Sequence, residues 1–494
     1  MIVMKRALQH LLKRHPVVVR CGTLFLLLSL LASLGIGLFE LPDSFFYAVL
    51  GQFLLTGYLT PVYPFNVSIP STLYAPVYSY LSAVILSTPW PWGITLIPFV
   101  QLLLVFVTGI IVYYLLQQFV SRMWAIVGAI LFFLLPFTFV YAMMFMSEIA
   151  DMFLLSVFLL VLYRVMHRQS PSHPGFLVFC TAAATLTHNL FVFLFAGSIL
   201  YWIGCEFSGI FRKKINVKPY SIAGRIAACV GIGGIVLWMG FNYRYYGTWA
   251  LTIAQGRTLY NGVVEQAHLL PPDDSPILKE FLQRAQTKEA LMSPNGEVGI
   301  YFAPEFYAGT ITEKQVDRLF LRFALEALKN NSVAYTSHIL QRFFTVPVTA
   351  PYDSWIHISL ELATQDCPEC GDPALCRASW NNSLCKPALD IPWLREAFLS
   401  FIHFQESFYP YPMGVVFLFA LVGTIVAIRA KGFLMVVGIL FLFFHGVQLT
   451  GVADGRYLLR LYPLYAICIL LGLRTLIIYL AAIFKKTVEI DKRK

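Results

Sequence analysis

Long apolar segments constrain this chain more than any other feature, because about 20 consecutive apolar residues are enough to cross a bilayer as a helix. Apolar residues make up 58% of the 494-residue sequence, and charged residues only 13%. This composition is typical of integral membrane proteins. We expect an all-α polytopic protein with about ten transmembrane helices, since a helix satisfies its own backbone hydrogen bonds in lipid. The expected spans are Gly22–Leu41, Ile94–Leu116, Trp124–Met143, Ser147–Val165, Gly175–Thr187, Asn189–Ile203, Ile226–Phe241, Met413–Ile428, Phe433–Val452 and Leu458–Leu480.

Lys and Arg are distributed unevenly along the chain, and their distribution indicates topology. Basic clusters alternate with connections that contain few Lys or Arg, as expected when basic loops stay in the cytoplasm. The expected cytoplasmic clusters are Lys5–Arg20, Arg164–Arg168, Arg212–Lys218, Arg429–Lys431 and Lys485–Lys494. Both termini would then be cytoplasmic. The net charge of +10 therefore reports orientation in a membrane, and we expect no nucleic-acid partner.

The apolar pattern divides the chain into three parts. Residues 1–243 form an N-terminal membrane module with an outer loop at 42–92, and residues 413–494 form a C-terminal membrane module with a basic tail. Residues 244–412 hold no segment that is long and apolar enough to span, so we expect a mixed extracytoplasmic domain there. Two of its segments, Leu319–Leu328 and Ser332–Phe344, have helical apolar spacing.

A cysteine cluster lies in this expected outer domain. Its members are Cys367, Cys370, Cys376 and Cys385. A CxxC pair followed by two further cysteines is also a zinc-knuckle pattern. Disulfides persist outside the cytoplasm, so we favour two disulfides over zinc, with the pairing left open.

The outer loop after the first span contains a single acid, Asp43, and no other Asp or Glu occurs before Glu148. Asp43 precedes an amphipathic helical run, which leads to a proline-containing loop and a second short helix at Ser71–Ser87. A carboxylate at a membrane edge is costly unless it is solvated, paired or used. A helix N-cap is an equally good interpretation, because Asp is a favoured cap residue.

Two further outward-facing sites carry polar side chains. Glu148 and Asp151 lie in the expected first turn of a span, where acids also suit the helix dipole. His188 and Asn189 lie in the tight turn between two spans, where a lone histidine is more often structural than catalytic.

A basic pair opens the last expected span. Arg456 and Arg460 are four residues apart and would share one helix face. Two guanidinium groups at the interface can bind a phosphate, although they can also reach towards lipid headgroups. A base, a phosphate clamp and a membrane groove suit transfer from a lipid-phosphate donor, and the sequence has no nucleotide-binding glycine loop.

Five segments resemble, in order, motifs of the GT-C superfamily of polytopic glycosyltransferases, close to the protein O-mannosyltransferase and lipid A aminoarabinose transferase branch. They are PDSFFYAVLGQFLLTGY (42–58), STLYAPVYSYLSAVI (71–85), LPFTFVYAMMFMSEIADMFLLSVFLLVLY (135–163), FNYRYYGTWALTIAQGRTLYNG (241–262) and GRYLLRLYPLYAI (455–467). Each motif is weak alone, and their common order makes the resemblance more specific.

The resemblance implies roles for particular residues. Asp43 would be the general base on the acceptor, with Glu148 supporting the site. Arg456, Tyr457 and Arg460 would hold the donor phosphate. Ser44 stands where many relatives carry a second acid, so no cofactor is assigned and a divalent cation stays open. The further candidates for substrate binding are His188, Asn189, Tyr74 and Arg244.

The leading interpretation is an inverting transferase that uses a polyprenyl-phosphate-linked sugar. Its acceptor would be a lipid, a glycan or a protein, and its setting a bacterial inner membrane rather than the endoplasmic reticulum. A flippase for lipid-linked oligosaccharides and a membrane assembly factor are the alternatives. A flippase should carry ionisable residues near mid-membrane, whereas the acids here cluster at expected helix ends.

Overall fold

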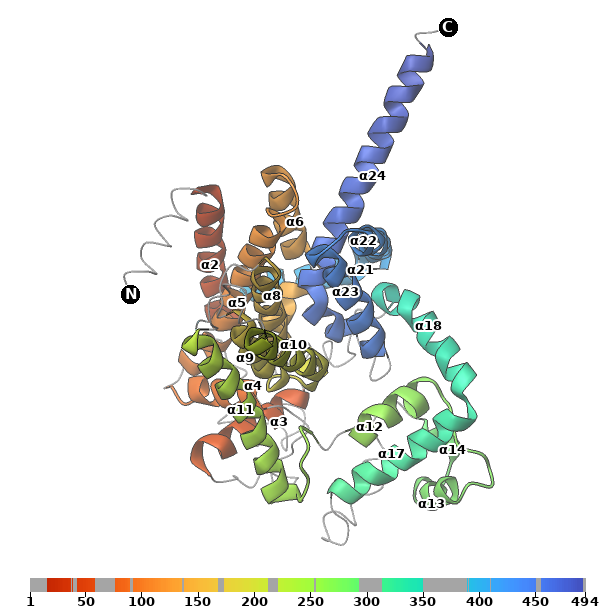
Figure 1. Ribbon diagram of the computed structural model, residues 1–494. Helices are drawn as coiled ribbons and strands as arrows, with labels where there is room; N and C mark the ends of the chain where they lie inside the picture. The colour runs from red at the N-terminus through yellow and green to blue at the C-terminus, as the bar shows by residue number, and fades with distance from the viewer. Residues whose placement is uncertain are drawn as a thin grey trace.

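The computed structural model describes residues 16–36, 38, 42–57, 76–88, 92–135, 137–167, 173–211, 221–252, 255–292, 313–349, 389, 391–408, 410–449 and 455–491. Within these ranges every regular element is a helix (Figure 1). The expected all-α class is therefore confirmed for the described residues. Tyr74 and the four clustered cysteines Cys367, Cys370, Cys376 and Cys385 lie outside them.

The N-terminal half forms a helical bundle. Its helices are α2 (Pro16–Ile36), α3 (Pro42–Thr56), α4 (Pro76–Leu86), α5 (Trp92–Leu116), α6 (Arg122–Leu134), α7 (Thr138–Ala142), α8 (Glu148–Met166), α9 (His173–Thr185), the 3-10 helix η1 (Asn189–Phe191), α10 (Val192–Phe211) and α11 (Ile222–Tyr246).

The middle of the chain forms a small helical domain, and the C-terminal part returns to the bundle. The middle helices are α12 (Gln255–Tyr260), the π-helix η2 (Asn261–Gln266), α13 (Pro276–Ala285), α14 (Lys288–Leu291), α17 (Glu313–Asn330) and α18 (Ser332–Thr349). The later helices are α21 (Pro392–Phe408), α22 (Pro410–Arg429), α23 (Phe433–Leu449), the 3-10 helix η4 (Gly455–Leu461) and α24 (Tyr462–Asp491).

Among the described residues, five helical stretches are long and apolar enough to cross a membrane. They are Thr95–Leu116, Glu148–Met166, Asn189–Phe207, Ile222–Tyr245 and Leu458–Ile483. Six further apolar helices are shorter. Together they support an integral membrane protein, and the count of ten spans stays a prediction.

Several expected helix boundaries are wrong, among them two in the N-terminal bundle. The span expected at Trp124–Met143 is interrupted, because α6 ends at Leu134 and α7 begins only at Thr138. Pro136 in the sequence explains the break, since the residue before a proline avoids the helical region, and Leu135 is extended at ψ 132°. The first helix ends at Ile36 rather than at Leu41.

The connection between α7 and α8 is buried. Met144, Phe145 and Met146 are at most 1% exposed. The Gln101 side chain of α5 supports this connection by donating to the carbonyl oxygens of Ala142 (3.2 Å) and Met144 (2.7 Å). Non-helical backbone within a membrane bundle needs such partners, because lipid offers none.

α22 and α24 pack at close range through two glycines. A Cβ atom on Gly423 would lie 1.6 Å from the Cys468 carbonyl oxygen, and one on Gly472 would lie 2.1 Å from the Phe419 carbonyl oxygen. Small residues permit this approach of helix backbones in membranes. The first part of α24 is therefore buried in the bundle, whereas its second part extends away from it (Figure 1).

The middle domain has an aromatic core of its own. Tyr260, Phe281, Phe320 and Phe323 are buried together, with Tyr260 and Phe320 ring centroids 4.8 Å apart. The helices expected near Leu319–Leu328 and Ser332–Phe344 are confirmed as α17 and α18. α18 runs from this domain to α22 and α23 (Figure 1), so it connects the two parts of the molecule.

Candidate functional site

Glu148 and Asp151 open α8 on one face of its first turn, because residues three apart on an α-helix are neighbours. Both side chains are buried, Glu148 at 1% and Asp151 at 0% exposed. Buried carboxylates require a cation or several donors. These two acids therefore do more than interact with the helix dipole, because this end of the helix is not solvated.

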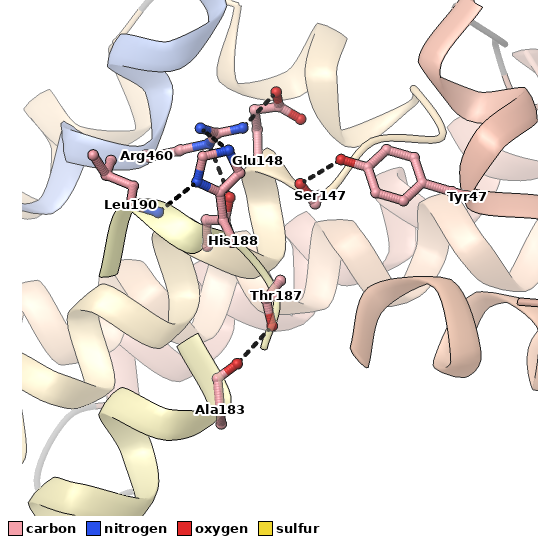
Figure 2. A network of polar contacts seen from close by, with 9 residues as sticks. Tyr47, Ser147, Glu148, Ala183, Thr187, His188, Leu190 and Arg460 are labelled. Atoms are coloured by element: carbon pink, nitrogen blue, oxygen red, sulfur yellow. Dashed lines mark hydrogen bonds and ion pairs between the residues drawn. The ribbon is translucent and has the colours of Figure 1, made fainter. Parts of the chain in front are cut away.

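Arg460 from η4 supplies that cation (Figure 2). Its Nη2 lies 3.0 Å from Glu148 Oε1, and its Nε lies 2.8 Å from Asp151 Oδ2. The arginine side chain is itself only 3% exposed. One guanidinium therefore bridges two acids that are more than 300 residues distant in sequence.

His188 completes this cluster from the turn before η1. Arg460 Nη1 lies 2.9 Å from His188 Nε2. A guanidinium can only donate, so Nε2 accepts and the ring proton belongs on Nδ1. The Leu190 amide lies 3.2 Å from the same Nδ1. A neutral imidazole accepts through one nitrogen only, and we favour the shorter, charge-assisted bond from Arg460.

Carboxylate oxygens of both acids in the cluster lack a hydrogen-bond partner among the described residues, namely Glu148 Oε2 and Asp151 Oδ1. Both atoms are buried. An unpaired buried acceptor is costly, which makes these atoms available to a donor from outside the described residues.

A second set of polar groups joins α3 and α4 to the cluster. The Tyr47 hydroxyl lies 3.0 Å from Ser147 Oγ, next to Glu148 in the chain (Figure 2). The Tyr47 ring packs edge-on against Tyr78, with centroids 5.0 Å apart. Burial raises the pKa of the Tyr78 hydroxyl well above its usual value, and the carboxylates of Glu148 and Asp151 raise it further. Tyr78 is therefore a neutral hydroxyl beside an acidic pair.

Asp43 belongs to the same helix face as Tyr47. α3 begins at Pro42, which places Asp43 inside its first turn and not at an N-cap. Residues four apart on an α-helix share a face, so Asp43 stands one turn from the tyrosine that contacts Ser147. The orientation of the Asp43 side chain lies outside the described structure.

The other expected site residues have different surroundings. Asn189 begins η1 next to His188, and its buried Oδ1 has no partner among the described residues. Arg244 is exposed in the last turn of α11, on a different element from the cluster. Arg456 and Tyr457 belong to η4, their side chains lie outside the described structure, and the shared face expected for Arg456 and Arg460 stays a prediction. A 3-10 helix superimposes residues three apart rather than four apart.

Sequence reasoning found Glu148, Asp151, His188 and Arg460 but missed the neutral residues Gln101 and Tyr47, which contact the segment just before α8. Gln101 had one usable signal, a single amide within a long apolar helix. Tyr47 had another, its four-residue spacing from Asp43. No group of three or more His, Cys, Asp or Glu side chains that could hold a metal ion is present among the described residues.

Comparisons with known proteins found no matching family model and no matching curated protein. Two solved structures are similar, both of ArnT from Cupriavidus metallidurans. The one bound to undecaprenyl phosphate has 12% identity and a TM-score of 0.36, and covers 90% of this chain and 77% of that one. The apo structure has 12% identity and a TM-score of 0.35, and covers 92% and 77%. Likeness at this level does not establish a shared fold, so a function for this chain has to rest on its own residues.

Proposed function

We propose that this chain is a GT-C-type glycosyltransferase that moves a sugar from a polyprenyl-phosphate-linked donor to an acceptor on the extracytoplasmic side of the membrane. One observation carries the proposal. Three segments that the sequence marked separately, around Glu148, His188 and Arg460, meet in one buried cluster. The helix with Asp43 reaches the same place through Tyr47 and Ser147.

In the proposed reaction Asp43 acts as the general base. It takes the proton from an acceptor hydroxyl or amine while that group attacks the anomeric carbon, with inversion. The new bond forms as the bond from the anomeric carbon to the phosphate oxygen breaks. The departing lipid phosphate keeps the electron pair, and its negative charge needs a positive partner.

Arg456 is the better partner for that phosphate. The guanidinium of Arg460 already faces two carboxylates, which offset its charge and would repel a second anion. We therefore assign Arg460 the role of holding Glu148 in place, with Glu148 Oε2 left open towards the acceptor or sugar. His188 keeps the guanidinium aligned through its accepting Nε2. Tyr457, Asn189, Tyr74 and Arg244 stay candidates for substrate binding.

The remaining parts of the proposal concern setting and organisation. Residues 1–243 and 413–494 would be the membrane modules of a bacterial inner-membrane protein with both termini cytoplasmic. Residues 244–412 would be the extracytoplasmic domain, with its four cysteines in two disulfides. The acceptor would be a glycan, a lipid or a protein.

The deciding experiment replaces Asp43 by Asn in the full chain. Cells lacking the protein, cells with the wild type and cells with Asp43→Asn are compared by mass spectrometry of their glycans and lipids. We expect Asp43→Asn to give the pattern of the deletion, with turnover reduced by about two to four orders of magnitude. Asp274→Asn, which changes an exposed acid of the middle domain, is the matched control and should behave as wild type.

Sugar transfer at the wild-type rate by Asp43→Asn would refute the role of Asp43 as the general base. Lipid-linked glycans that accumulate untransferred on the cytoplasmic side would instead favour the flippase.

A further inference from the structure

The last turn of α18 contains a buried proline, Pro347. Proline has no backbone N–H, so the carbonyl oxygen four residues earlier, that of Phe343, loses its helical partner. A buried carbonyl without a partner is costly. The carbonyl of Phe343 therefore needs a donor from outside α18.

His445 of α23 is that donor. Its Nε2 lies 3.1 Å from the Phe343 carbonyl oxygen, and the histidine is 0% exposed. Because a carbonyl only accepts, Nε2 carries the ring proton. Nδ1 then accepts from the Tyr465 hydroxyl of α24, 3.3 Å away. A single neutral imidazole thus joins α18, α23 and α24.

Packing around this histidine extends the connection to η4. The Phe343 ring stands edge-on to the His445 ring, with centroids 4.5 Å apart. One turn further on, Val346 of α18 packs against Leu458 of η4, and both are buried. Leu458 precedes Arg460 by two residues on the same short helix. The contacts that hold the end of α18 are therefore continuous with the element that carries Arg460.

We propose that His445 is a positioning residue that replaces the hydrogen bond Pro347 removes from α18. It fixes the helix of the middle domain against the membrane bundle at the start of η4. The middle domain and the arginine-bearing segment are then held as one unit. The effect on the site rests on the proposed function, whereas the hydrogen-bond replacement does not.

The test is a double-mutant cycle on the full chain in detergent. His445→Phe keeps a ring but removes the donor, and Pro347→Ala restores an N–H to Phe343 from within α18. We expect His445→Phe alone to lower the apparent melting temperature by several degrees. In the Pro347→Ala background, His445→Phe should lower the melting temperature clearly less, because the effects of substitutions at residues that share a partner are not additive. His445→Gln, which can donate and accept at similar positions, should restore most of the loss.

Pro98→Ala is the matched control, because Pro98 also lies inside a helix, α5, but frees the carbonyl of Ile94 instead. Combined with His445→Phe it should be additive. An equal loss from His445→Phe in the wild-type and Pro347→Ala backgrounds would overturn the proposal. If His445→Phe alone does not fold, rescue of folding by Pro347→Ala supports the proposal, and failure of rescue contradicts it.

Binding of a short-chain polyprenyl phosphate measures the link to the site. Folded His445→Phe should bind this probe several-fold more weakly, and Pro347→Ala should restore the affinity. Unchanged affinity in folded His445→Phe would limit the histidine to stability and refute its positioning role. If wild type does not bind the probe, the proposed donor is wrong, while the melting cycle still decides the hydrogen-bond replacement.

Discussion

At the scale of single residues, the most consequential side chain is Arg460, because it is the cation for two buried acids. Its side chain is 3% exposed, so neither solvent nor salt screens its pairing with Glu148 and Asp151. Such a pair adds little net stability compared with an apolar replacement of all partners, but removal of one partner leaves buried charge. We therefore expect the arginine to matter for stability as well as for the proposed site.

We expect Arg460→Met to destabilise the protein by about 3–5 kcal/mol, since two carboxylates would remain buried without a cation. Arg225→Met is the control, because Arg225 pairs with Glu206 at a surface where the arginine side chain is 54% exposed. That change should cost at most about 1 kcal/mol. Thermal unfolding in detergent compares the two, and equal melting temperatures would argue against the buried ion cluster.

His188 offers a finer test of the same cluster. His188→Gln keeps an accepting oxygen near the place of Nε2, whereas His188→Leu leaves Arg460 Nη1 without that acceptor. We expect His188→Leu to cost about 1–3 kcal/mol and His188→Gln to cost clearly less. If the two variants have the same melting temperature, the contact between His188 and Arg460 contributes nothing to stability.

Glu265 of the π-helix η2 gives a prediction about pH. Burial raises the pKa of its carboxyl group from 4.5 to about 7. The folded protein then binds more protons than the unfolded chain between these values, so the free energy of unfolding falls as the pH rises from about 4.5 through about 7. Glu265→Gln should remove this part of the slope. Melting curves of the wild type and Glu265→Gln at several pH values test this prediction. The same dependence of stability on pH in both proteins would contradict a raised pKa for Glu265.

At the scale of elements, the close packing of α22 on α24 matters for the site because α24 continues directly from η4. Gly423 and Gly472 leave no room for a side chain between the two backbones. A methyl group there cannot be accommodated by a rotamer change, since the opposing atoms are backbone carbonyl oxygens. Any relief must move a whole helix.

We therefore expect Gly423→Ala and Gly472→Ala to lower stability by about 1–3 kcal/mol each, as overpacking does. Gly446→Ala is the matched control, because a Cβ on this glycine of α23 would meet no atom within 4 Å. The measurement is thermal unfolding together with transfer activity. Wild-type stability and activity of both Gly423→Ala and Gly472→Ala would mean that α22 and α24 are not packed this closely.

The elements also mark how far sequence reasoning reaches. Apolar periodicity located α5, α8, α10 and α11, because a long apolar run has few alternatives in lipid. It failed around Pro136, where the sequence alone does not distinguish a kinked helix from a broken one. The outcome depends on partners from other helices, such as Gln405 of α21, whose Oε1 accepts from the Phe137 amide at 3.1 Å. It also assigned an α-helix to η4, since 3-10 and α-helical spacing differ too little over seven residues.

At the scale of the whole molecule, charge placement predicts an orientation that a labelling experiment can check. Single cysteines near Asp43 and near Arg456 should react with a membrane-impermeant reagent from outside, and cysteines near Lys214 only after permeabilisation. Each would be introduced into a cysteine-poor background. Labelling of the Asp43 and Arg456 positions from opposite sides would exclude a shared site.

The site could be predicted only in part from the sequence, because its contacts join distant parts of the chain. Charged residues in an apolar chain are few, so Glu148, His188 and Arg460 stand out in the sequence. That they share one guanidinium depends on contacts across 312 residues, which no local pattern contains. The same holds for His445, whose partner carbonyl was freed by a proline 98 residues before it in the chain.

α24 has 30 residues and projects beyond the bundle (Figure 1), and its length sets a depth scale for the protein. At 1.5 Å per residue an α-helix of this length spans about 45 Å, compared with a hydrocarbon core of about 30 Å. Arg460 lies just before one end, and Lys485 and Lys486 lie towards the other. In the predicted orientation, with the lysines at the cytoplasmic headgroups, the length of this helix would place Arg460 near the opposite membrane surface. The tilt of this helix would adjust to the thickness of the bilayer, and the tilt would then determine the depth of the Arg460 cluster below the membrane surface.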